Sequence, residues 1–177
     1  MNLKKIVGIL TLIILVIFSG NTEAATEKLT IVRVYDGGAY ELNEKLKAGG
    51  FIPANTALDK GTRQLNGVTP YYSIAVFSKS YVSIIYQVND EGHVSLIMIE
   101  SPVFEKNNHE KIIRQICLLL GLSDSQTDKL FNSRYDLDWL RFNRMYDIPY
   151  AVAKNRKFNM SEEFKDNKFK TIILAFI

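Results

Sequence analysis

The sequence predicts an α+β fold, in which two to four helices pack on an antiparallel β-sheet. Three strand-length segments follow one another between residues 71 and 101 and are joined only by short turns. Strands joined so briefly must be antiparallel neighbours, so the centre of the sheet is expected to be a three-stranded meander. The segments before and after this meander carry apolar residues at helical spacing, which favours helices packed on the sheet.

The first 24 residues have the order of a secretory signal peptide. Lys4 and Lys5 precede an apolar run from Ile6 to Phe18, and small and polar residues ending at Ala24 follow. The rival interpretation is an uncleaved membrane anchor, but a spanning helix needs roughly 20 apolar residues. We therefore expect cleavage after Ala24 and one domain over residues 25–177 with no stable membrane insertion. The expected location is periplasmic, cell-surface or secreted, and the residue usage fits a bacterial source.

The charge balance gives little reason to expect nucleic acid as a partner. Removing Lys4, Lys5 and Glu23 from 22 basic and 19 acidic residues leaves 20 and 18, a net charge of +2. Residues 141–170 contain eight basic and four acidic residues, so a mildly basic face is one interpretation of this region. An ordinary solvated surface is the simpler interpretation.

The first half of the mature chain is expected to form a strand, a helix and a long connection. Residues 29–35 are rich in β-branched side chains and predict a strand. Ala39, Leu42 and Leu46 lie at helical spacing before two glycines. Residues 51–70 carry turn signals and predict an ordered loop or a short strand. The Asp36-Gly37-Gly38 turn could present N–H groups to an anion, but a plain tight turn is the simpler interpretation.

The meander is expected to have one buried face. In its middle strand, Val82, Ile84, Tyr86 and Val88 alternate with more polar positions. Its three strands are predicted at residues 72–78, 81–88 and 93–100, with a hairpin loop at residues 89–92.

The second half of the chain is expected to form three helices and two strands. Asn108 is the predicted N-cap of the first helix, and Ser123 or Asp124 that of the second. The first helix is predicted at residues 109–120, the second from its cap at Ser123 or Asp124 to about residue 131, and the third at residues 136–146. The two strands are predicted at residues 150–153 and 171–177.

The sequence carries no specific catalytic, metal or cofactor motif, and none of these is expected. His93 and His109 match no metal-binding spacing, and one cysteine cannot build a thiolate zinc site. Cys117 falls on the apolar face of its predicted helix, where a thiol is inert.

The most suggestive pattern is an aromatic stripe, which we define as Tyr135, Trp139, Phe142 and Tyr146. Their spacing places the four rings on one side of a helix, with Arg141 and Arg144 beside them. Such a stripe usually faces the core. The alternative is an exposed face that grips a peptide or stacks on sugar rings.

Three functions remain open from the sequence. The first is an exported, non-enzymatic module that binds a protein or glycan partner. The second is a secreted hydrolase acting on glycan or peptide, with Glu100, Asp136 and Asp138 as candidate carboxylates. The third is an inhibitor or immunity-type protein that occludes the active site of another protein.

Overall fold

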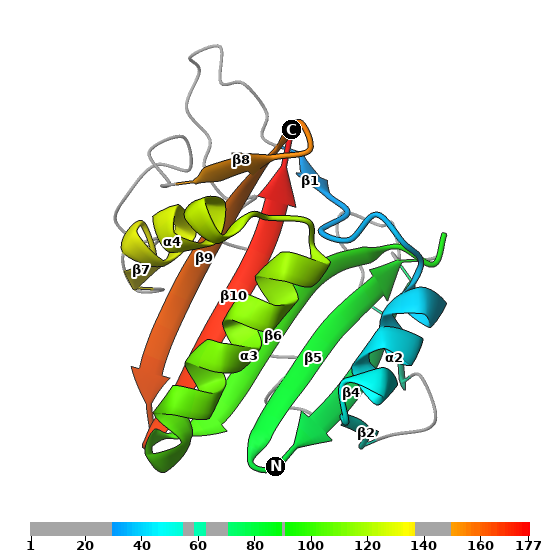
Figure 1. Cartoon of the computed structure of the whole chain (residues 1–177). Helices are drawn as coiled ribbons and strands as arrows, with labels where there is room; N and C mark the ends of the chain where they lie inside the picture. Colours follow the sequence, from blue (N-terminus) through cyan, green and yellow to red (C-terminus); the bar gives the residue numbers. More distant parts are fainter. Residues whose placement is uncertain (1–29, 55–58, 63–70, 90, 137–149) are drawn as a thin grey trace.

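The computed structural model describes residues 30–54, 59–62, 71–89, 91–136 and 150–177. Across these residues a sheet of ten strands carries three α-helices, all on one of its faces (Figure 1). The predicted α+β class and the antiparallel sheet are therefore confirmed. None of the described helices is long and apolar enough to cross a membrane.

The sheet is antiparallel except at one short edge pair. Its main path is β2-β4-β5-β6-β10-β9-β7, while β1 pairs with β10, β3 with β4 and β8 with β9. Among the described strands, β7 and β9 alone run parallel. The strands are β1 (Ile31–Val32), β2 (Ile52–Pro53), β3 (Asp59–Thr62), β4 (Tyr71–Lys79), β5 (Val82–Asn89), β6 (Val94–Pro102), β7 (Tyr135–Asp136), β8 (Ala151–Ala153), β9 (Arg156–Lys165) and β10 (Lys168–Phe176).

The predicted meander is part of a larger sheet. Strands β4, β5 and β6 pair consecutively as expected, but β10 continues the sheet beside β6 and β9 pairs with β10. The sequence did not predict β9. Its hairpin with β10 turns at Asp166 and Asn167, whose φ angles are 52° and 57°. Asn and Asp tolerate this left-handed conformation, which two-residue hairpin turns require.

Three α-helices cover one face of the sheet: α2 (Ala39–Ala48), α3 (Lys106–Leu119) and α4 (Asp124–Asn132), with a 3₁₀ turn η1 (Val103–Glu105) before α3. Ser123 caps α4 as predicted, because its hydroxyl accepts from the Gln126 N–H while the Gln126 side chain accepts from the Ser123 N–H. The predicted cap at Asn108 is wrong. Helix α3 begins earlier, since η1 continues directly into it from Glu105.

Two other boundaries differ from the predictions. The strand predicted at residues 29–35 is reduced to β1, after which Val34 and Tyr35 are buried without extending the strand. The helix predicted from Asp136 does not begin there, because Tyr135 and Asp136 form β7 against β9. Extended pairing at the sheet edge therefore replaces the helical conformation at these two residues.

The main core lies between the sheet and the helices. Ile84, Ile99 and Ile173 from three neighbouring strands are buried with Ile113 and Ile116 of α3. Each fully buried aliphatic side chain of this size contributes about 1.5–3 kcal/mol. This core holds α3 across the middle of the sheet.

The opposite face of the central strands is also apolar. Ile85 is the cross-strand partner of Met98, which is the partner of Ile172, and all three are at most 2% exposed. Their neighbours Ile84, Ile99 and Ile173 point to the helix side. Because both faces are apolar, β6 and β10 contain nearly continuous apolar runs in place of simple alternation.

Candidate functional site

The first member of the aromatic stripe belongs to the interior. Tyr135 is 7% exposed, and its hydroxyl shares a hydrogen bond with the side chain of Ser161. Burial raises the pKa of Tyr135 to about 12. This ring therefore cannot form part of an exposed binding face. The other predicted binding residues, Trp139, Arg141, Phe142, Arg144 and Tyr146, lie outside the described residues.

The two candidate carboxylates that can be located are not brought together. Glu100 is buried and accepts a 2.9 Å hydrogen bond from Lys168 Nζ. Asp136 lies in β7, three strand positions away across the sheet, which corresponds to about 14 Å. Paired glycosidase carboxylates lie roughly 5–9.5 Å apart. Glu100 and Asp136 therefore do not form such a pair, and Asp138 lies outside the described residues.

His109 forms a buried polar bridge between α3 and the sheet. Its Nδ1 lies 2.8 Å from Ser101 Oγ, and its Nε2 lies 2.8 Å from Thr171 Oγ1. Burial lowers the pKa of His109 to about 4. A serine beside a histidine can serve as a nucleophile and base. Here the three side chains are at most 4% exposed, so substrate cannot reach them, and the contact joins α3 to β6 and β10.

Cys117 is in the core, as the sequence predicted. Its side chain is fully buried, and burial raises the pKa of its thiol to about 12. His93 does not begin a strand, but it forms an isolated antiparallel β-bridge with Gly38. Its Nδ1 lies 3.1 Å from Glu91 Oε2. Within the described residues, no group of three or more His, Cys, Asp or Glu side chains could hold a metal ion.

Large apolar side chains are exposed where β9, β6 and β4 end. We call this surface the aromatic end, and it consists of the exposed Tyr81, Val103, Phe104 and Phe164 with the half-buried Phe169. Tyr81 and Phe104 form an edge-to-face pair with ring centroids 5.2 Å apart, and Phe164 and Phe169 lie 5.0 Å apart. The exposed fractions of Tyr81, Phe104 and Phe164 are 64%, 69% and 57%. Leaving these rings in water sacrifices the gain from burying them, so a solvent-exposed cluster points to a contact surface.

Tight backbone turns hold the aromatic end in place. Tyr81 follows Ser80, whose φ of 56° belongs to the two-residue turn between β4 and β5. The Val103 N–H donates a 3.0 Å hydrogen bond to the Asn167 carbonyl, which ties η1 to the turn between β9 and β10. The rings are therefore presented on a fixed frame, which reduces the ordering entropy that a partner must overcome.

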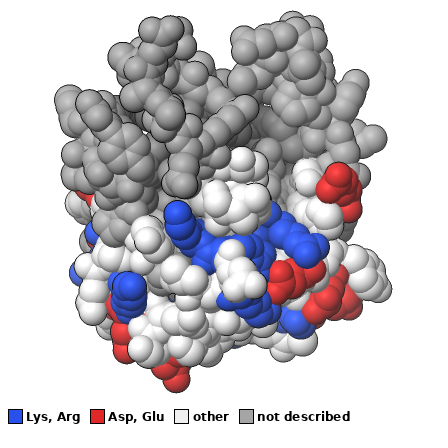
Figure 2. Space-filling model, turned by 90° about the horizontal axis from the view of Figure 1, so that it is seen from above, with Lys and Arg blue, Asp and Glu red and all other residues white. Residues whose placement is uncertain are grey.

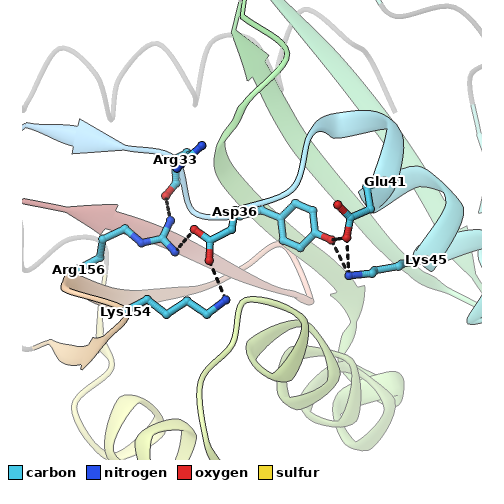
Figure 3. Close-up of polar contacts among 7 residues, drawn as sticks. Arg33, Asp36, Glu41, Lys45, Lys154 and Arg156 are labelled. Carbon is cyan, nitrogen blue, oxygen red and sulfur yellow. Dashed lines mark hydrogen bonds and ion pairs between the residues drawn. The ribbon is translucent and has the colours of Figure 1, made fainter.

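A second surface, which is polar, lies at the opposite end of the sheet. We call it the basic end, and it consists of Arg33, Lys154, Arg156 and Lys157 with the carboxylate of Asp36. Figure 2 views the molecule from this end and shows Lys and Arg side chains gathered there beside acidic ones. In Figure 3 Asp36 lies between Arg156 and Lys154. The distances are 2.6 Å from Asp36 Oδ1 to Arg156 Nη2 and 2.7 Å from Asp36 Oδ2 to Lys154 Nζ.

A separate network lies beside the basic end in Figure 3. The Tyr35 hydroxyl donates a 2.6 Å hydrogen bond to Glu41 Oε1. Lys45 Nζ lies 2.7 Å from the Tyr35 hydroxyl oxygen and 2.7 Å from Glu41 Oε1. Hydrogen bonds from Lys45 and Tyr35 lower the pKa of Glu41. A Cβ at Gly37 would lie within 3.0 Å of the side chains of Glu41 and Tyr35, so a larger residue would force both side chains to move. Gly37 therefore has a packing role in this network.

A scan against protein-family models and searches of the curated proteins and the solved structures found no match to this chain.

The sequence did not single out either surface. Tyr81 lies in a tight turn, and an aromatic ring in a turn is the one signal that could have indicated this surface. The basic end unites Arg33 with residues more than a hundred positions later. The basic excess in residues 141–170 and the anion-binding interpretation of the Asp36-Gly37-Gly38 turn were the two signals that pointed toward it.

Proposed function

We propose that the protein is an exported, non-enzymatic binding module that docks on another protein through its aromatic end, at the bacterial envelope or outside the cell. The observation that carries this proposal is the exposure of Tyr81, Phe104 and Phe164 at one end of the sheet, where Tyr81 lies in the turn between β4 and β5, Phe104 in η1 and Phe164 near the end of β9. Tyrosine and phenylalanine supply large contact areas at protein interfaces for little loss of side-chain entropy.

Ring geometry favours a protein partner over a glycan. A sugar ring stacks on a flat, exposed aromatic face, and an oligosaccharide needs several such faces side by side. The planes of Tyr81 and Phe104 are inclined by 75°, and those of Phe164 and Phe169 by 41°, so neither pair offers a coplanar platform. The aliphatic Val103 between the pairs suits a protein pocket better than a carbohydrate.

Two lysines lie at the same end of the sheet as the apolar side chains. Lys106 Nζ lies 5.5 Å from the centre of the Phe169 ring, and Lys168 is paired with Glu100. An apolar centre with a charged rim is the ordinary composition of a transient protein interface. An inhibitor or immunity-type protein would use the same kind of surface, with one tightly bound stoichiometric partner.

Affinity capture tests the proposal. The protein, expressed from its full chain and purified in the form that the cell produces, is immobilised and exposed to envelope extract. Each captured protein is then purified and titrated against the wild type by calorimetry. The double variant Tyr81→Ser/Phe104→Ser should bind the partner at least thirtyfold more weakly, because truncation of even one central aromatic residue costs about 2 kcal/mol or more.

Val152→Ser provides the matched control, since Val152 is also an exposed apolar residue but lies in β8 at the far end of β9. It should leave the affinity unchanged. Equal loss in both variants, or no saturable protein partner, would overturn the proposal. Binding of a purified envelope glycan that only the double variant abolishes would replace the protein partner with a glycan. Hydrolysis of such a glycan or peptide by the wild type would favour the secreted hydrolase.

A further inference from the structure

At the basic end, three cations surround one carboxylate. Asp36 is contacted by Lys154 and Arg156, and Arg33 is close enough for its charge to act on the same group. The hydrogen bond from Lys154, with the charges of Arg156 and Arg33, lowers the pKa of Asp36. Three positive charges against one negative charge leave a local excess of two. The internal pairing therefore neutralises only part of the positive charge.

The cations differ in how firmly they are held. Arg156 is 8% exposed and also donates from Nη1 to the Arg33 carbonyl, so its guanidinium is fixed in the structure. The Lys154 side chain is 47% exposed and extends from the turn between β8 and β9, where Lys154 and Asn155 have φ angles of 51° and 60°. Arg33 is also exposed. Lys154 and Arg33 are therefore the cations that a ligand can reach.

We propose that the basic end binds a phosphate group carried by a polymer or a lipid headgroup. Lys154 and Arg33 would contact the phosphate, and Asp36 would act as the internal competitor for Lys154. The phosphate of a lipid headgroup or of an inner polymer unit carries about one negative charge and a terminal phosphate close to two, and the local excess of two can neutralise either. Arg and Lys are the side chains that bind phosphate most strongly. Lys157, placed 5.4 Å from the centre of the Tyr150 ring, adds a further cation at this end.

This site is independent of the proposed protein partner. Arg156 begins β9 and Phe164 lies near its other end, so the two surfaces are separated by nearly the length of a ten-residue strand, about 30 Å. A protein partner on the aromatic end would leave the basic end accessible. The two proposals can therefore fail separately.

The neighbouring network of Glu41 and Lys45 supplies matched controls. Lys154→Gln removes a positive charge from the basic end, and Lys45→Gln removes one from the neighbouring network. In the same way, Asp36→Asn removes a negative charge from the basic end, and Glu41→Gln removes one from the neighbouring network. Binding is measured by calorimetry in 50 mM salt with inorganic phosphate, with polyphosphate and with phosphatidylglycerol vesicles. Urea midpoints establish that each variant is folded, and Arg33→Gln replaces Lys154→Gln if that variant does not fold.

Lys154→Gln should weaken binding about tenfold, because it removes a charge-assisted hydrogen bond. Asp36→Asn should strengthen binding, because the phosphate no longer competes with a carboxylate. Lys45→Gln and Glu41→Gln should leave the affinity unchanged. Saturable binding of polyphosphate alone identifies a polymer, and binding of vesicles alone identifies a lipid headgroup. Equal weakening by Lys154→Gln and Lys45→Gln, or no binding of any probe by the wild type, overturns the proposal.

Discussion

The imidazole of His109 joins α3 to β10 through a 2.8 Å contact between His109 Nε2 and Thr171 Oγ1. Because Ser101 occupies the other ring nitrogen, both nitrogens are used and the ring is held between helix and sheet. The arrangement suits a neutral imidazole. Its protonation therefore affects how firmly α3 is held.

Acid should destabilise the protein through this histidine. The pKa of His109 falls from an ordinary 6.5 to about 4 in the folded state, so between these values the unfolded chain binds more protons. The free energy of unfolding should therefore decrease as the pH falls through this window, by about 2 kcal/mol between pH 7 and pH 5. Urea unfolding at several pH values measures it. His109→Gln, which cannot titrate, should lose most of this dependence, and an unchanged dependence would contradict the assignment.

Arg156→Met should destabilise the fold by about 1–2 kcal/mol, because the Arg33 carbonyl loses its donor and Asp36 loses a cation in a partly buried position. The midpoint of urea unfolding at pH 7 reports this change. Lys45→Met is the comparison, since it also removes a cation bonded to a carboxylate but on the exposed surface. It should have no measurable effect, as exposed ion pairs contribute little. Equal losses would show that burial of Arg156 is unimportant.

Two tyrosine-to-phenylalanine substitutions should have opposite effects on stability. Among the described residues, the Tyr86 hydroxyl is buried without a hydrogen-bond partner, whereas that of Tyr135 bonds to Ser161. Tyr86→Phe removes an unsatisfied buried group and should raise the free energy of unfolding by up to about 1 kcal/mol. Tyr135→Phe should lower it by about 1 kcal/mol. Urea denaturation curves of both variants measure these changes. A lower free energy of unfolding for Tyr86→Phe would reveal a hydrogen-bond partner for the Tyr86 hydroxyl.

Cys117 should resist thiol reagents in the native protein. Its side chain is fully buried, and the pKa of the thiol is raised to about 12, so almost no thiolate is present at pH 8. Dithionitrobenzoate should label the urea-unfolded chain completely within minutes while leaving the folded protein unmodified. Rapid stoichiometric labelling of the folded protein would place the thiol at the surface.

The sequence predicted those elements whose pattern is local. The strands around residues 82–88, the capping residue Ser123 and the burial of Cys117 follow from spacing and turn residues near them in the chain. Strand β9 was missed because seven of its ten residues are polar or charged, and two of these, Asn159 and Ser161, are buried.

The surfaces were harder to predict because tertiary structure assembles them. Phe104 meets Tyr81 across the ends of two strands, and Arg156 meets Asp36 over a separation of 120 positions. No periodicity in the sequence brings such residues together. Tyr135 illustrates the converse, because its helical spacing to later aromatics gave no sign that it pairs with β9 in an extended conformation.

The position of β10 between β6 and β9 also has a consequence for how the chain folds. Residues 168–176 form an inner strand of the sheet, and their partners include β1, more than 140 positions earlier. Contacts between such distant segments make folding slow, because loop-closure entropy must be overcome before the contacts form. Strands β4, β5 and β6 can pair early, but the partners of β10 on both sides must wait until residues 168–176 have been made. Under the proposed export, this slow pairing would leave the chain incompletely folded, and therefore competent for translocation, for longer.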